Sequence, residues 1–238
     1  MKRGLHYNIH SNSGGKYLKS WVYGGLDGIV TTFAVVAGVV GANLSSAIIL
    51  IMGFANLIGD GISMAVGDYL STKSQGEYYR NEKILEELQA KKNPSLEKEE
   101  MKNILIKKGF KKSDAKKISL LISKNKPYQA ETMLHDELGL VYDNIHPERN
   151  GLATFASFII FGMIPLVIFV VSLIFNIQIK NAFFWACFLS GISMFLLGVI
   201  KSKITKKNWL KSGLVTLFVG GIAATAAYFV GELLSNIV

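Results

Sequence analysis

The chain has 238 residues, of which 50% are hydrophobic and 18% are charged, and its mean hydropathy is positive at +0.33. This balance excludes an intrinsically disordered chain, and the single cysteine excludes an intrachain disulfide framework. The formal net charge of +9 would suit a nucleic-acid-binding protein, but the charges are segregated between apolar segments, so we expect no nucleic-acid partner. We predict an all-α integral membrane protein.

Residues 1–20 are polar and contain no apolar run that would act as a cleavable signal, so we expect them to form a cytosolic N-terminal tail. Five later segments are each long and apolar enough to cross a hydrocarbon layer as a helix. They are residues 21–43, 46–70, 153–177, 182–200 and 212–236. The predicted organisation is therefore two spans within 21–70, an insertion at 71–150, and three spans within 151–238, the first of which is kinked near Met163 and Pro165.

The basic residues predict the orientation of the spans. Of the 26 Lys and Arg residues, 16 lie in segment 71–150, five lie just before the last span, and Lys180 alone follows the third span. Because Lys and Arg favour the cytosolic side, this distribution places the insertion in the cytosol and the loop containing Lys180 outside.

The first two spans contain acidic side chains, which are costly in hydrocarbon and usually face a cavity, a partner or an ion path. Asp27 is the only charged residue of the first span. In the second span, Asn56, Asp60, Met64 and Asp68 recur every four residues and so share one helix face. Carboxylate oxygen with thioether sulfur suits a divalent transition metal, and carboxylates can exchange a metal for protons. The alternative is that Asp60 and Asp68 are packing or interfacial groups and Met64 fills space.

The insertion is too polar for the bilayer, and its turn residues predict a soluble helical unit. We expect a continuation of the second span to about Lys91, a helix capped by Ser95, another capped by Ser113, and a last helix that ends near Gly139.

Acidic residues recur at helical spacing in three of these predicted helices. They are Glu82 with Glu86, Glu97 with Glu100, and Glu137 with Met133. Side chains from three helices could converge on one metal cluster. The alternative is a solvated surface, because glutamates interleaved with lysines usually form exposed i, i+4 pairs.

Three runs carry a family resemblance: YGGLDGIVTTFAVVAGVVGA, GDGISMAVGDYLSTKSQ and ETMLHDELGL. In order and spacing the chain resembles the vacuolar iron transporter family from about Trp21 to its end. The resemblance implies a five-span homodimer that moves Fe²⁺, and often Mn²⁺, out of the cytosol in exchange for protons, along a path between the subunits. It further implies path residues at Asp27 and Met64. The cytosolic metal ligands that it implies are Glu86, Glu97, Glu100, Met133 and Glu137.

The chain departs from the family pattern at several of these sites. Gln89 and Leu134 stand where the family carries a glutamate and a methionine, so we expect fewer bound metals than in the family. Asp68 replaces a glutamate, Asp60 stands at a position that is usually small, and Asn56 is interpreted as a replacement for a carboxylate.

These observations predict a secondary transporter in which the cytosolic acids collect Fe²⁺, the membrane residues pass it across, and protons return. Mn²⁺, Co²⁺ and Zn²⁺ are alternative substrates, and no tightly bound cofactor is expected. The membrane would be that of a vacuole or another acidic organelle in a eukaryote and the cytoplasmic membrane in a prokaryote. A metal buffer or sensor anchored in the membrane is the alternative, although an anchor gains nothing from buried carboxylates. An enzyme is not expected, because the sequence has no Ser-His-Asp set, phosphate loop or His-rich metal site.

Overall fold

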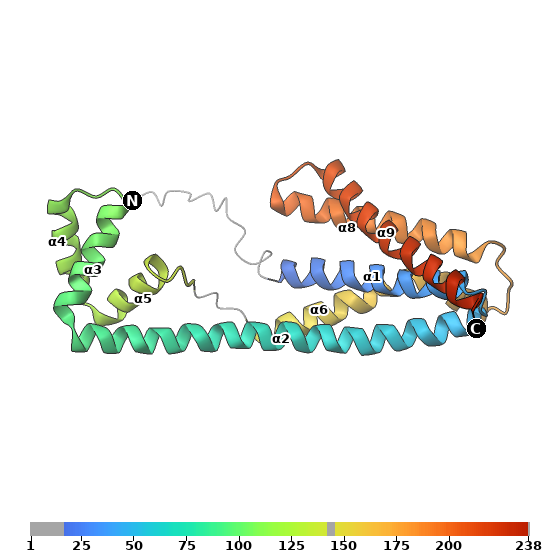
Figure 1. Ribbon diagram of the computed structural model, residues 1–238, viewed down its shortest axis with the longest axis horizontal. Coiled ribbons are helices and arrows are strands. Elements are labelled where there is room, and N and C mark those ends of the chain that lie inside the picture. Colours follow the sequence, from blue (N-terminus) through green and yellow to red (C-terminus); the bar gives the residue numbers. More distant parts are fainter. Residues whose placement is uncertain (1–16, 142–145, 238) are drawn as a thin grey trace, which may run out of the picture. The chain divides into compact units, whose positions relative to one another are not determined.

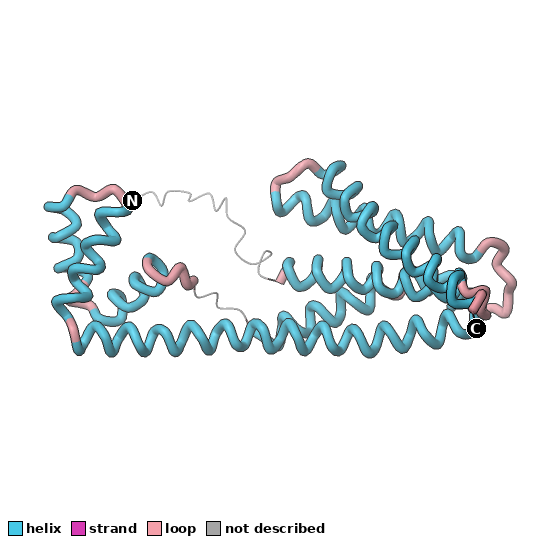
Figure 2. Tube along the Cα trace, in the orientation of Figure 1, coloured by secondary structure: helices cyan, strands magenta, loops and turns pink. Residues whose placement is uncertain are grey.

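The computed structural model describes residues 17–141 and 146–237, and all regular secondary structure within these ranges is helical (Figure 2). The first 16 residues of the expected tail lie outside the described residues. The elements are α1 (Leu18–Gly41), α2 (Ser46–Lys92), α3 (Pro94–Lys107), α4 (Lys112–Ile122), α5 (Lys126–Asp136), α6 (Pro147–Gly162), η1 (Ile164–Leu166), α7 (Val167–Ile174), α8 (Ala182–Thr205) and α9 (Trp209–Ser235). They divide into two compact units, one made of 1–70 with 145–238 and one of 71–144.

In the described part of the chain, five helical segments are long and apolar enough to cross a membrane, as predicted. The third of them consists of α6, η1 and α7, and the short 3₁₀ turn at Ile164–Leu166 confirms the predicted kink. Pro165 explains the break, because proline has no N–H to donate to the helix and its ring clashes with the preceding turn. This span also begins at Pro147, earlier than the expected residue 153, because proline fits the first turn of a helix.

Two predicted helix caps in the insertion are wrong. Helix α3 begins at Pro94, with Asn93 rather than Ser95 at its N-cap. Proline at the first helical position has its backbone angle already set for a helix, so α3 starts one residue before the serine. Helix α4 likewise begins at Lys112, and Ser113 lies inside its first turn, where its hydroxyl donates to Asp114.

Helix α1 packs against both α6 and α9 (Figure 1). The contact with α6 is close because glycines of α1 face its backbone: a Cβ added at Gly24 would lie 2.5 Å from the carbonyl oxygen of Thr154. On the same side, the Ser157 hydroxyl donates to the Trp21 carbonyl oxygen at 2.5 Å. Small residues that let two backbones approach are a common basis of helix association in membranes.

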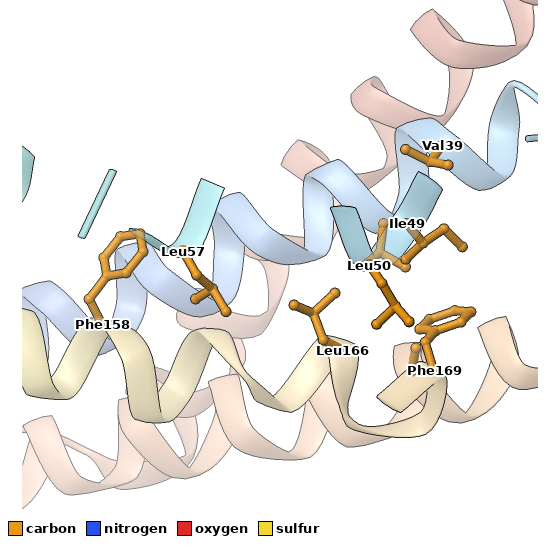
Figure 3. Close-up of a cluster of buried hydrophobic side chains, with 9 residues drawn as sticks. Val39, Ile49, Leu50, Leu57, Phe158, Leu166 and Phe169 are labelled. Atoms are coloured by element: carbon orange, nitrogen blue, oxygen red, sulfur yellow. The ribbon is translucent and has the colours of Figure 1, made fainter. Parts of the chain in front are cut away.

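A cluster of buried apolar side chains joins α2 to α1 and to the third span. Figure 3 shows Leu57 of α2 beside Phe158 of α6, and Leu50 of α2 facing Leu166 and Phe169. Leu57, Phe158 and Leu166 are almost fully buried. This packing holds the 46–70 part of α2, which contains the predicted path residues, against the other spans.

We predict that Gly24→Val destabilises the protein by about 1–3 kcal/mol, because the new side chain would overlap the backbone of α6. The measurement is the midpoint of thermal unfolding of the purified chain in detergent. Gly221→Ala is the matched control, since a Cβ there meets no atom within 4 Å. An unchanged midpoint for Gly24→Val would contradict the close α1–α6 contact.

Candidate metal path and glutamate cluster

Asp27 of α1 and Asp60 of α2 are the two half-buried carboxyl groups at the centre of the predicted path. They lie close enough to repel each other. Among the described residues, neither carboxyl group has a hydrogen-bond or ion-pair partner. A pair of unpartnered carboxylates on adjacent membrane helices is costly, and a cation or a proton between them would relieve that cost.

Asn56 lies one turn before Asp60 and faces α1. Its amide nitrogen is 3.4 Å from the Thr31 hydroxyl and 3.5 Å from the Thr32 hydroxyl, and it donates to both. The Thr31 hydroxyl in turn donates to the backbone carbonyl of Asp27 at 2.8 Å. The Asn56 side chain therefore helps to join the two helices beside Asp27, an interaction that the spacing within the second span alone does not predict.

Met64 lies one turn after Asp60 and is half-buried against the cluster of Figure 3. The thioether thus packs against apolar side chains while remaining on the same helix face as Asp60. Its predicted part in the path stays a prediction, beside the alternative that it fills space.

Asp68 differs from the other stripe residues because hydrogen bonds satisfy its carboxylate. One oxygen accepts from the Ser20 hydroxyl of α1 at 2.7 Å and from the Thr154 hydroxyl of α6 at 2.6 Å. Both hydroxyl residues are buried. Asp68 therefore ties three helices together, which favours a structural role over a role in the path. Sequence reasoning missed both partners, because Ser and Thr occur throughout the chain and nothing distinguishes these two.

In the unit formed by 71–144, the predicted glutamates lie within electrostatic range of one another. Glu86 is 8% exposed and Glu97 is 1% exposed. Burial raises the pKa of Glu86 to about 7, and repulsion from the other four glutamates adds to this effect. These four are Glu97, Glu137, Glu100 and Glu82. Burial, followed by Glu100 and Glu137, also raises the pKa of Glu97.

Two residues that sequence reasoning missed lie near this glutamate cluster. Lys126 opposes the rise in the pKa of Glu97, and its ammonium group donates to the Gln129 side chain at 3.3 Å. Within the described residues, one carboxylate oxygen of Glu97 and the amide nitrogen of Gln129 are buried without a hydrogen-bond partner. In the sequence, Gln129 could have been found only from its spacing of four residues to Met133, which places the two residues on one helix face.

The glutamate cluster is not arranged as a closed metal site. Within 17–141 and 146–237, no three His, Cys, Asp or Glu side chains come close enough together to hold a metal ion. Met133 is buried among Met101, Leu105 and Ala115, in the apolar core of the unit. The predicted glutamate ligands are therefore close enough to repel one another, and their role in metal binding stays a prediction.

Comparison with known proteins gives consistent matches over almost the whole chain. The model of the VIT family matches residues 18–232. A protein of Toxoplasma gondii named vacuolar iron transporter is 39% identical, covering 99% of this chain and 80% of the relative. Its namesake in Plasmodium berghei is 36% identical over 99% of this chain and 87% of its own length. Vacuolar iron transporter 1 of Arabidopsis thaliana is 27% identical, with 97% and 91% covered.

We predict that Asp68→Ala lowers the stability of the protein by about 1–3 kcal/mol, because two buried hydroxyl groups lose a charged acceptor. Thermal unfolding in detergent measures the effect, and Glu131→Ala, at an exposed position of α5, is the control. If Asp68→Ala instead keeps full stability and loses transport, Asp68 belongs to the path.

We predict that the metal-free protein loses stability as the pH rises from about 4.5 to about 7. Glu86 has a folded-state pKa of about 7 and an ordinary pKa of 4.5, so in this range the folded state holds the proton more tightly than the unfolded state. Its contribution is complete below the ordinary pKa and is lost as the pH passes the folded-state value.

The test follows the thermal midpoint of the chelator-treated full chain across this range. Glu86→Gln should give a flatter profile, because the amide does not titrate. Glu131→Gln, at an exposed position of α5, should keep the wild-type slope. Parallel profiles for the wild type and Glu86→Gln would rule out Glu86 as the titrating group.

Proposed function

The chain belongs to the VIT family, and we propose that it is a secondary transporter that moves Fe²⁺ out of the cytosol in exchange for protons. The relatives' names support iron as the substrate. Mn²⁺ and other divalent transition metals of similar size are further substrates in this proposal. The five apolar helices provide the membrane domain, and the relatives' names favour the membrane of a vacuole or a similar organelle.

The observation that carries the proposal is the pair formed by Asp27 and Asp60. Both carboxyl groups lie in apolar helices, repel each other, and have no described partner that would neutralise them. A divalent cation between them would remove the repulsion, and so would protons. Since the metal favours the ionised carboxylates and protons favour the neutral ones, the two ligands compete for one site. This competition is the physical basis for exchanging metal against protons.

Met64 adds a softer ligand at the next turn of α2. Sulfur favours transition metals over Mg²⁺ and Ca²⁺, which prefer shells made only of oxygen. A path with carboxylate oxygen and thioether sulfur would therefore select Fe²⁺ from the more abundant hard cations of the cytosol.

The glutamate cluster would act as the cytosolic collecting site. Because Glu86 has a pKa of about 7, it is about half protonated at near-neutral pH, and a metal ion that binds there displaces the remaining proton. As the pH falls, protons compete more strongly and the cluster releases its metal. The amide oxygen of Gln129, which accepts from Lys126, is a further oxygen donor beside the cluster.

The working form in this proposal is a homodimer with the path between the subunits. Asn56, Asp60 and Met64 are each partly exposed within one copy of the chain. One chain therefore leaves the path residues open on one side, and a second copy would enclose them.

A membrane-anchored metal buffer or sensor is the alternative function, in which the glutamate cluster binds metal and the spans only anchor it. The buried hydrogen bonds of Asp68 fit either function. Unpartnered carboxylates at Asp27 and Asp60 are costly in a membrane, however, and a helix that only anchors the protein gains nothing from them. The relatives are named as transporters rather than enzymes, which supports a function without catalysis.

We predict that Asp27→Asn abolishes transport while the fold is kept, because the amide has nearly the same volume but cannot ionise. Met64→Leu should slow Fe²⁺ transport severalfold, because it keeps the size and removes the sulfur. Uptake of ⁵⁵Fe²⁺ into proteoliposomes with an imposed pH gradient is the measurement.

Glu131→Gln, which removes an acidic group from the exposed side of α5, is the control and should transport normally. Unfolding midpoints of all variants separate loss of transport from loss of fold. Normal uptake by Asp27→Asn would remove Asp27 from the path. Wild-type protein that binds Fe²⁺ but gives no uptake would instead favour the buffer or sensor.

A further inference from the structure

A basic pocket lies at the turn between α8 and α9, in the membrane unit and apart from the path residues. Its volume is about 480 Å³, and its lining includes Lys201, Lys207 and Lys211. All three lysines are exposed, and none forms a described ion pair. No acidic residue lines the pocket. The pocket therefore offers three ammonium groups to an anion.

Three of the four neutral polar side chains that line this pocket have hydrogen-bond partners, and Ser212 is the fourth. Asn208 caps α9 by accepting from the backbone N–H groups of Leu210 and Lys211, at 3.0 and 3.2 Å. The hydroxyls of Thr205 and Thr216 donate to backbone carbonyls of their own helices. The lysines are the charged groups among the described lining residues, so anion binding is testable by removing their charge.

An apolar groove lies along the same helix. It has a volume of about 670 Å³, and Phe218, Gly221, Ile222 and Phe229 are among its lining residues. Phe218 is 70% exposed, and a Cβ added at Gly221 would meet no atom within 4 Å. The groove is therefore open, and in a membrane helix such an outer surface faces lipid.

The basic pocket and the apolar groove share one stripe of α9. Lys211, Val215, Phe218 and Ile222 follow one another at spacings of four, three and four residues, which places them on one helix face. Val215 lines the basic pocket, while Phe218 and Ile222 line the groove. A positively charged end continues into an apolar channel, and this matches a molecule with an anionic head and a hydrocarbon tail.

We propose that this face of α8 and α9 holds an anionic phospholipid, with its phosphate among the three lysines and an acyl chain along the groove. Basic pockets between membrane helices are suited to anionic lipid headgroups. A zwitterionic lipid fits less well, because its own cationic group would lie beside the lysines. The site involves none of the path residues, so it stands or falls independently of the proposed transport.

The test measures lipid binding to the delipidated full chain in detergent by native mass spectrometry, with phosphatidylglycerol and phosphatidylcholine of identical acyl chains. We expect phosphatidylglycerol to bind more tightly, and added salt to weaken it. The Lys201→Gln, Lys207→Gln, Lys211→Gln triple variant should bind about 100-fold more weakly, since each lysine near an anionic lipid contributes a factor of about five.

The matched control removes the same charge elsewhere, as Lys91→Gln, Lys92→Gln, Lys107→Gln, and should bind like the wild type. Gly221→Leu places a side chain in the groove, at a position where a Cβ meets no atom within 4 Å, and should weaken phosphatidylglycerol binding with all lysines present. If the triple variant does not fold, Lys207→Gln alone, in the exposed turn, should still weaken binding severalfold.

Four results would overturn the proposal. They are equal binding of the two lipids, an equal loss in the control variant, unchanged binding by Gly221→Leu, and inorganic phosphate that stabilises the chain as strongly as phosphatidylglycerol does. The last result would reassign the pocket to a free phosphate ion.

Discussion

Hydrocarbon supplies no water to polar groups, and this constraint organises the membrane unit. Polar side chains in the spans must find partners within the protein or carry a cost that function compensates. Asp68 meets the constraint through Ser20 and Thr154, and Asn56 through Thr31 and Thr32. The same interactions fix how α2 sits against α1. Asp27 and Asp60 are the contrasting case, and their lack of described partners is what makes them available to a ligand.

The spans and their approximate ends follow from the sequence, because a run of about 20 apolar residues has few alternatives to a membrane helix. The stripe on α2 was also predictable from its four-residue spacing. Its division into bonded and unpartnered groups was not. Asp60 and Asp68 look alike in the sequence, and only the packing of α1 and α6 brings two hydroxyl groups to Asp68 alone.

The unit formed by 71–144 shows the same limit in another form. Spacing left open whether Glu86 and Glu97 converge or belong to a solvated surface, and the structure places them within electrostatic range, both buried. It did not predict Lys126, which partly offsets the charge at Glu97, because a lysine among many lysines carries no signal. The predicted cap at Ser95 was wrong because proline at the first helical position starts α3 one residue earlier. The predicted cap at Ser113 was wrong because α4 begins at Lys112, after Lys111.

The glycine contacts of α1 have a mechanical consequence. Backbone meets backbone at Gly24 on the α6 side and at Gly41 on the α9 side, where a Cβ would collide with the Tyr228 carbonyl group. Such close backbone contacts resist sliding of one helix along another, so we expect α1 to keep its position between α6 and α9. In the proposed transport, a movement that exposes Asp27 first to one side of the membrane and then to the other would therefore come from the elements around α1, while Asp27 stays in place.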